Sequence, residues 1–81
     1  MNILYFAWIR ERIGMPSETV ETSAATVADL ITELRGREPR YELAFSDMAA
    51  IRVAVDQELA ELDAPLAGVA EVAFFPPMTG G

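Results

Sequence analysis

The sequence predicts an α+β domain in which one main helix packs on one face of a mixed sheet of four to five strands. Three observations lead to this class. The chain has 81 residues and is 52% hydrophobic, which suits one small domain with its own core. Several short segments are β-branched and aromatic, or alternate apolar with polar residues. Only one segment carries a long apolar stripe at helical spacing.

The N-terminal part predicts two paired strands. The continuous apolar run from Ile3 to Ile9 is typical of a central strand that is covered on both faces. Residues 10–16 contain Gly14 and Pro16, which indicate a loop. The segment from Ser17 to Thr22 then alternates β-branched with charged residues, so we expect it to form a hairpin with the first strand.

The main helix is expected from residue 26 onward. Thr26 and Asp29 form a variant of the capping box, in which both side chains accept free amide protons of the first turn. Apolar residues at i, i+3, i+4 and i+7 then form one core-facing stripe: Val27, Leu30, Ile31 and Leu34. Gly36 is expected to end the helix in the left-handed conformation. Pro39 to Phe45 indicate a second, short helix.

The C-terminal third predicts the remaining strands. Residues 51–55 alternate apolar side chains with Arg52 and Ala54, which indicates a strand with one buried face. Residues 56–58 supply a turn before a short strand at Leu59, and residues 62–68 form a loop. Residues 71–75 alternate again, and this strand stops at Pro76, which has no amide proton to donate to a sheet.

The alternation in the last strand predicts an apolar patch on the helix-free face of the sheet. If Val72 and Phe74 face the helix, Phe75 must point to the opposite face. There we expect Phe75 to join Ala54 and Trp8, or neighbours of Trp8. A contiguous apolar patch beside a functional tail is typical of a binding surface. We therefore predict a partner interface at Phe75, Trp8 and Ala54.

The composition excludes many kinds of chemistry. The chain has no cysteine and no histidine, and all six basic residues are arginine. Cysteine nucleophiles, histidine bases, lysine Schiff bases and zinc sites are therefore excluded, and we predict no metal site. The net charge of −7 argues against nucleic-acid binding. No apolar run has the roughly 18 residues of a membrane helix, and the N-terminal residues lack signal-peptide features, so we expect a cytoplasmic protein without a membrane partner.

We expect a domain over residues 1–75 and a flexible tail over residues 76–81, which ends in Gly80-Gly81. Six extended residues at about 3.3 Å each reach roughly 20 Å. Pro76 and Pro77 favour a stiff, extended start, whereas the two glycines let a carboxylate enter a channel too narrow for any Cβ. The alternative is a frayed terminus without a function.

The reactive group of such a tail is the α-carboxylate of Gly81. A carboxylate is a poor electrophile until ATP converts it to an acyl-adenylate. The chain has no Gly-rich phosphate loop or other nucleotide-binding motif. We therefore expect a separate activating enzyme to use the ATP, and we expect no cofactor to be bound by this chain.

These residues resemble the small, sulfur-carrying subunit of molybdopterin synthase, a family of ubiquitin-like carriers with the β-grasp fold. The resemblance covers the whole chain. It rests on these segments: Leu4–Ala7 followed by Arg10-Glu11, Thr26-Val27, Val55–Gln57, and above all Glu71–Pro77 with Gly80-Gly81. The chain departs from the family at residues 67–70, where members often have an Asp-Gly turn, and members vary at Trp8.

The resemblance implies that Gly81 is adenylated, converted to a thiocarboxylate and inserted into the large synthase subunit. There it would donate sulfur to a pterin precursor in molybdenum cofactor biosynthesis. The chain would not be an enzyme alone but one subunit of a heterotetramer with two small and two large subunits. Phe75 would anchor the interface. The tail residues expected in the partner's channel are Pro76, Pro77, Met78, Thr79 and Gly80.

Three other functions remain open at this point. A sulfur carrier for thiamine or thiolated nucleosides would use the same chemistry with another acceptor. A ubiquitin-like modifier would be attached through Gly81 to lysines of other proteins. A binding module would use the tail only as an anchor.

Overall fold

The structure, a computed structural model, describes residues 1–77. The predictions for Met78, Thr79, Gly80 and Gly81 therefore lie outside the described residues. In chain order the elements are β1 (Asn2–Tyr5), α1 (Ala7–Ile13), β2 (Ser17–Thr19), α2 (Val27–Arg35), α3 (Pro39–Ala44), a 3₁₀ turn (Met48–Ala50), β3 (Arg52–Val55), β4 (Glu58–Ala60) and β5 (Glu71–Phe75).

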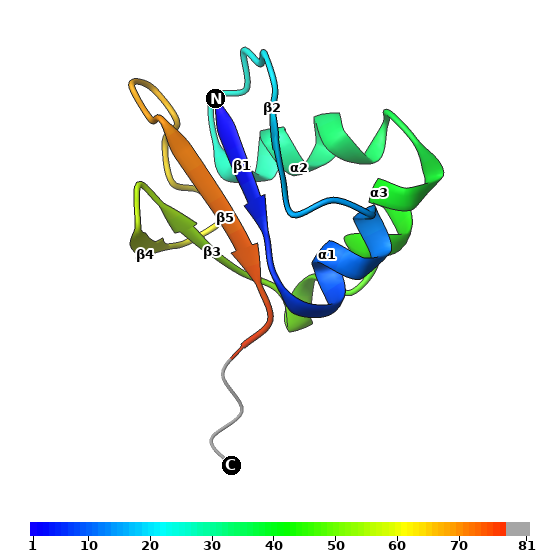
Figure 1. Cartoon of the computed structure of the whole chain (residues 1–81). Helices are drawn as coiled ribbons and strands as arrows, with labels where there is room; N and C mark the ends of the chain where they lie inside the picture. The colour runs from blue at the N-terminus through cyan, green and yellow to red at the C-terminus, as the bar shows by residue number, and fades with distance from the viewer. Residues whose placement is uncertain (78–81) are drawn as a thin grey trace.

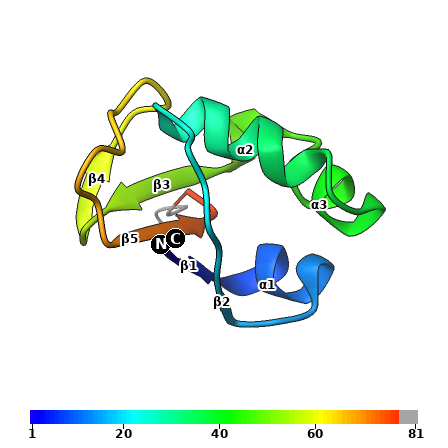
Figure 2. The ribbon, with the colours of Figure 1, turned by 90° about the horizontal axis from the view of Figure 1, so that it is seen from above.

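The strands form one mixed sheet in the order β2-β1-β5-β3-β4. β1 runs parallel to β5, whereas the β1–β2, β3–β5 and β3–β4 pairs are antiparallel. α2 and α3 lie on one side of this sheet, and the opposite side carries no helix over β5 and β3 (Figures 1 and 2). This arrangement is the β-grasp fold, so the predicted fold class is confirmed.

The core forms between α2 and the inward face of the sheet. The predicted α2 stripe is buried, and Thr26 Oγ1 accepts the amide proton of Asp29 at 3.2 Å, which confirms the predicted role of Thr26 as the N-cap. Among the hydrogen bonds of residues 1–77, none to the Asp29 carboxylate completes the predicted capping box. From the sheet, Val72 and Phe74 of β5 are fully buried. The Phe74 ring meets Phe45 edge-on, with centroids 5.1 Å apart. Alternation along β5 therefore places one set of side chains in the core and leaves the other set on the helix-free face.

The predicted strand from Ile3 to Ile9 is wrong beyond Tyr5, and the loop expected at residues 10–16 is mostly helix. Ala7 adopts φ 53°, which reverses the chain into α1. Ile9 and Ile13, at i and i+4, are the buried residues of this helix. Gly14 ends it at φ 93°, with its amide proton on the Arg10 carbonyl at 2.8 Å. The two flanking strands still pair as predicted, although a helix rather than a loop joins them.

The expected left-handed conformation of Gly36 is also wrong, since its φ is −80°. Its amide proton continues the helical pattern, with bonds to the carbonyls of Thr32 and Glu33. This right-handed last turn carries the chain directly into α3, which begins at Pro39 as predicted. Among residues 1–77, none of the helices has the length and apolar character needed to cross a membrane.

One carboxylate links three elements of the fold. Glu18 on β2 accepts hydrogen bonds from the hydroxyls of Tyr5 on β1, at 2.7 Å, and Tyr41 on α3, at 2.6 Å. Both tyrosine side chains are buried. Burial and these hydrogen bonds to Glu18 raise the pKa of Tyr41 to about 12, and the same causes hold the pKa of Tyr5 well above its ordinary value. The folded state therefore favours protonated tyrosines.

We expect the protein to lose stability as the pH rises from about 10, where tyrosines of the unfolded chain ionise, to about 12. A raised pKa means that the folded state binds the proton more tightly, so the stabilisation is complete below this window and is lost within it. Glu18→Gln removes the carboxylate charge, and we expect its stability to fall less steeply over the same window. Thermal melts followed by circular dichroism at stepped pH measure this. Glu21→Gln, an exposed neighbour, is the control. If the stability of Glu18→Gln falls as steeply with pH as that of the unmodified protein, Glu18 does not contribute to the raised pKa values of the two tyrosines.

Candidate functional site: an apolar hollow on the helix-free face

A hollow of about 570 Å³ lies on the helix-free face of the sheet. We call it the sheet-face hollow. It is lined by Leu4, Phe6, Ala54, Gln57, Glu71, Ala73, Phe75 and Pro76. Leu4, Ala73 and Ala54 are register partners on β1, β5 and β3, so they form one row across the sheet. Because the two alanines carry only a methyl group, the floor between the larger side chains stays low.

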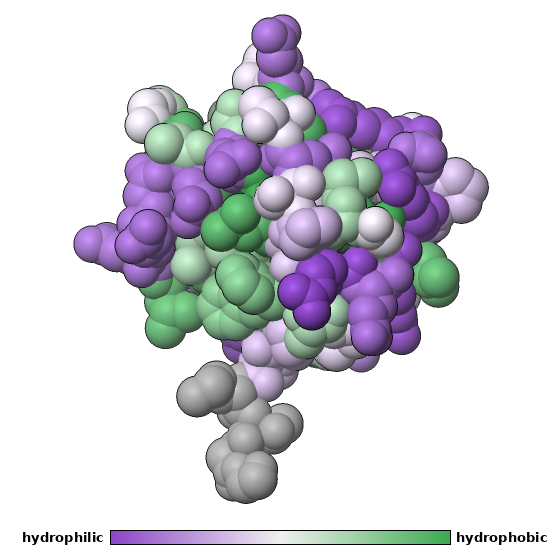
Figure 3. All heavy atoms as spheres, in the orientation of Figure 1, coloured by the Kyte–Doolittle hydropathy of each residue, from purple (hydrophilic) through white to green (hydrophobic). Residues whose placement is uncertain are grey.

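The rim of the sheet-face hollow is aromatic and partly exposed. Phe6 leaves 44% of its surface accessible, and Phe75 is partly exposed. The Phe6 amide proton bonds to the Phe74 carbonyl at 3.1 Å, which holds the end of β1 beside β5. Hydrophobic residues gather on this face among hydrophilic ones (Figure 3). Such a surface is suited to receive an apolar side chain of another protein.

The structure brings two of the three predicted interface residues together. Ala54 and Phe75 both line the sheet-face hollow. Trp8 does not line it, because α1 carries that residue away from the sheet. The Trp8 ring packs against the core and lies 4.6 Å from the guanidinium carbon of Arg12. Phe6, a neighbour of Trp8, occupies the face instead. That these side chains contact a partner stays a prediction.

Sequence reasoning missed Leu4, Gln57, Glu71 and Ala73 as lining residues. Leu4 and Ala73 meet because β1 pairs in parallel with β5, a pairing between strands that are far apart in the sequence. The identical direction of Ala73 and Phe75 on β5 was the available signal, since residues two apart share a face.

The sheet-face hollow adjoins the start of the tail. β5 ends at Phe75, and the next residue, Pro76, lines the hollow itself. Pro77 is the last described residue. A partner bound in the hollow would therefore also meet the chain where it leaves the sheet.

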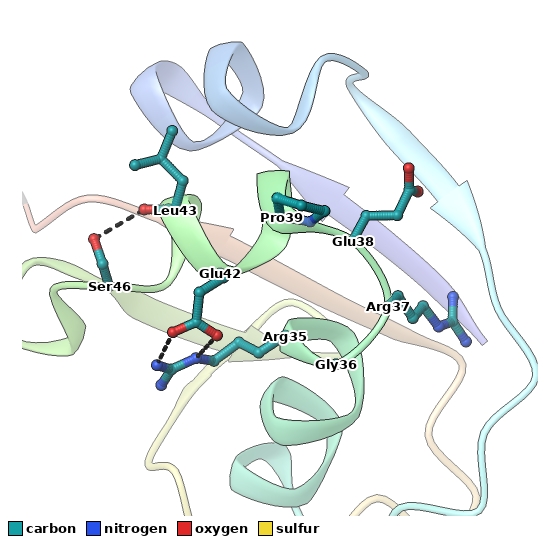
Figure 4. Close-up of a pocket in the computed structure, with 8 residues that line it drawn as sticks. All are labelled: Arg35, Gly36, Arg37, Glu38, Pro39, Glu42, Leu43 and Ser46. Atoms are coloured by element: carbon teal, nitrogen blue, oxygen red, sulfur yellow. Dashed lines mark hydrogen bonds and ion pairs between the residues drawn. The ribbon is translucent and has the colours of Figure 1, made fainter.

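A second hollow, of about 580 Å³, lies between α2 and α3 (Figure 4). Three of its four charged lining residues, Arg35, Glu38 and Glu42, take part in ion pairs. The Arg35 guanidinium makes two hydrogen bonds to the Glu42 carboxylate, at 3.1 and 2.5 Å, and this contact lowers the pKa of Glu42. Glu38 pairs with Arg40 at 2.9 Å. Because most of the charged side chains here are already paired and Pro76 lines the other hollow, we take the sheet-face hollow as the candidate site.

The lining of the sheet-face hollow is mostly apolar. Its polar lining residues are one glutamine and one glutamate. Within residues 1–77, no group of three histidine, cysteine, aspartate or glutamate residues could hold a metal ion. The fold and this hollow together define a small ubiquitin-like domain with an apolar face at the base of its C-terminal segment.

Comparison with known proteins specifies the class further. The model described as "ThiS family" matches residues 3–81, so the chain belongs to the ThiS family. The molybdopterin synthase sulfur carrier subunit of Escherichia coli is 38% identical over all of this chain and 99% of its own length. The protein of the same name from Haemophilus influenzae is 35% identical, with the same coverage.

A solved structure supports the fold. The crystal structure of SAMP1 from Haloferax volcanii, a small archaeal modifier protein, superposes with a TM-score of 0.78. The two sequences are 31% identical, and the match covers 100% of this chain and 98% of that one. Ubiquitin-like carriers and modifiers thus share this architecture.

We expect Phe75→Ser to reduce the fluorescence of the dye anilinonaphthalene sulfonate in the presence of the folded protein, since the dye binds exposed apolar surface. Leu43→Ser is the control because Leu43 is 58% exposed but lies outside the sheet-face hollow. Circular dichroism verifies that both variants are folded. A larger loss of fluorescence with Leu43→Ser would contradict the assignment of the apolar face.

Proposed function

We propose that this chain is the sulfur carrier subunit of a molybdopterin synthase. The observation that carries the proposal is the similarity, over the full length of this chain, to three sulfur carrier subunits of molybdopterin synthase at 35–38% identity. The apolar hollow at the base of the tail supports it, because a carrier must dock on an enzyme while its tail enters that enzyme.

In this proposal the chemistry begins at the Gly81 carboxylate. One carboxylate oxygen attacks the α-phosphorus of ATP, pyrophosphate leaves, and an acyl-adenylate forms. A sulfur nucleophile of the sulfide class then attacks the carbonyl carbon, AMP leaves, and a thiocarboxylate results. A separate activating enzyme binds the ATP, and this chain holds no resident cofactor or metal.

The thiocarboxylate then acts inside the large subunit. Its sulfur forms a bond to a carbon of the pterin precursor and displaces an oxygen substituent, which leaves with the electron pair of the broken carbon–oxygen bond. Water then cleaves the bond between that sulfur and the carbonyl carbon, which restores the Gly81 carboxylate. Each passage delivers one sulfur atom, so a dithiolene needs two. We expect a heterotetramer of two small and two large subunits, as the resemblance to the family implies. The large subunit supplies the other catalytic groups, so the small chain is not an enzyme alone.

The roles of the structural parts follow from this scheme. The sheet-face hollow, with Phe75 and Ala54, docks on the large subunit. Pro76 and Pro77 hold the chain extended as it leaves β5, which limits the entropy lost on insertion. Met78, Thr79 and Gly80 then lie in the partner's channel and bring Gly81 to the acceptor.

The similarity to the small archaeal modifier protein favours one second candidate, a protein modifier that is joined through Gly81 to lysines of other proteins. The chain has no lysine of its own, so it would not form lysine-linked chains on itself. A modifier would produce a ladder of heavier adducts in a cell lysate. A carrier for another sulfur acceptor would instead bind a different large partner.

The decisive test uses the absence of cysteine. We expect the protein, after incubation with ATP, a sulfide source and its activating enzyme, to take up a thiol-alkylating reagent at Gly81 and nowhere else. Peptide mapping by mass spectrometry locates the label. Intact mass alone is insufficient, because oxidation of any of the four methionines nearly matches an exchange of oxygen for sulfur.

The matched control carries one extra alanine after Gly81. Both carrier proposals predict that this extension abolishes labelling, since the reactive carboxylate is displaced from its position. A simple binding module, which uses the tail only as an anchor, would keep its function with the extra alanine. Adenylation of the normal terminus without any subsequent label would turn the assignment toward a modifier or an anchor.

A further inference from the structure

The turn between β3 and β4 has a backbone that its sequence does not favour. Asp56 and Gln57 both have positive φ, 48° and 71°. Two consecutive left-handed residues are typical of the type I′ turn, in which Asn-Gly and Asp-Gly are strongly preferred. Aspartate tolerates this conformation, but a residue with a long side chain such as glutamine is strained in it. Glycine at residue 57 would make the same turn without strain.

Asp56 has a visible structural role in this turn. Its Oδ1 atom accepts the amide protons of Ala70 and Glu71, at 3.1 and 3.0 Å. Its own amide proton bonds to the Glu71 carbonyl at 2.9 Å. These bonds fix the turn to the start of β5. They explain the residue at 56 but not the glutamine at 57.

Gln57 contributes to the sheet-face hollow instead. Its side chain is exposed and lines the hollow together with Ala54 and Phe75. Within residues 1–77 its carboxamide takes part in none of the hydrogen bonds that hold the fold. The Asp56 bonds thus hold the backbone that carries Gln57 at the rim of an apolar surface, while the carboxamide of Gln57 keeps its own donor and acceptor available.

We propose that Gln57 determines which partner the sheet-face hollow accepts, through hydrogen bonds from its carboxamide to a backbone peptide group of the large subunit. A carboxamide offers one donor and one acceptor side by side, which matches the N–H and C=O of an extended peptide. A partner without such a group would leave the carboxamide of Gln57 buried without a hydrogen-bond partner. The binding free energy lost in this way discriminates between partners. The inference rests on the proposed function, since that function supplies the partner.

The strain at Gln57 predicts an unusual combination of effects. Gln57→Gly removes the carboxamide and relieves the left-handed strain, so we expect the melting temperature to rise by about 4 °C while the dissociation constant for the large subunit rises about tenfold. Gln57→Met keeps the length of the side chain and the strain. For this variant we expect the same weakening of binding without the gain in melting temperature.

The measurement is isothermal titration calorimetry of each full-length variant with the purified large subunit from the same organism, alongside thermal melts. Phe75→Ala is the reference for docking through the hollow. If Phe75→Ala weakens binding but both Gln57 variants bind like the unmodified protein, the role of Gln57 is overturned and the proposed function stands. If Phe75→Ala also binds normally, docking through this face is wrong, and the inference about Gln57 falls with it.

Discussion

The parallel pairing of β1 with β5 is the constraint on which the rest of this structure depends. It joins residues 2–5 to residues 71–74, so the two ends of the domain become neighbouring strands in the interior of the sheet. On the inner face this pairing places Tyr5 beside Phe74, with ring centroids 6.2 Å apart, and closes the core. On the outer face it places Leu4 beside Ala73 and creates the floor of the sheet-face hollow. Stability and binding surface thus arise from opposite sides of the same two strands.

The division of polar groups follows from this arrangement. The buried side chains among residues 1–77 are aliphatic and aromatic, and the two tyrosines among them donate their hydroxyl protons to Glu18. Polar contacts instead tie the edges to the body of the fold: Glu18 joins β2 to α3, and Asp56 joins the β3–β4 turn to β5. The open face between these attachments is free of such contacts over its apolar floor. A partner that docks there need not break a hydrogen bond of the domain.

Much of the fold could be predicted because local patterns agree with tertiary packing. Three local patterns each predicted one structure that the fold contains. These are the α2 stripe, the Thr26 cap and the alternation in β5. The segment from Phe6 to Ile13 was mispredicted because an apolar run with aromatic and β-branched residues suits a buried strand and a buried helix alike. Left-handed Ala7 decides between them, and alanine gives no sequence signal for that conformation. The spacing of Ile9 and Ile13 was a weak indication of helix.

The candidate site was predictable only in part. Phe75 and Ala54 follow from strand alternation, whereas Leu4, Phe6 and Gln57 reach the hollow through pairings between distant strands and through a strained turn. The sequence of one strand does not by itself specify the register of its pairing with a strand that is distant in the chain. This is why Trp8 was predicted on the face and its neighbour Phe6 occupies it.

The position of β5 in the chain also bears on how the protein is made. β5 is the central strand of the sheet, yet it follows every other element in the order of synthesis. While the ribosome adds residues one by one, β1 and β3 have no partner between them until residues 71–75 emerge. The complete sheet therefore forms only after residues 71–75 have been synthesised, because β5 is the strand that joins β1 to β3.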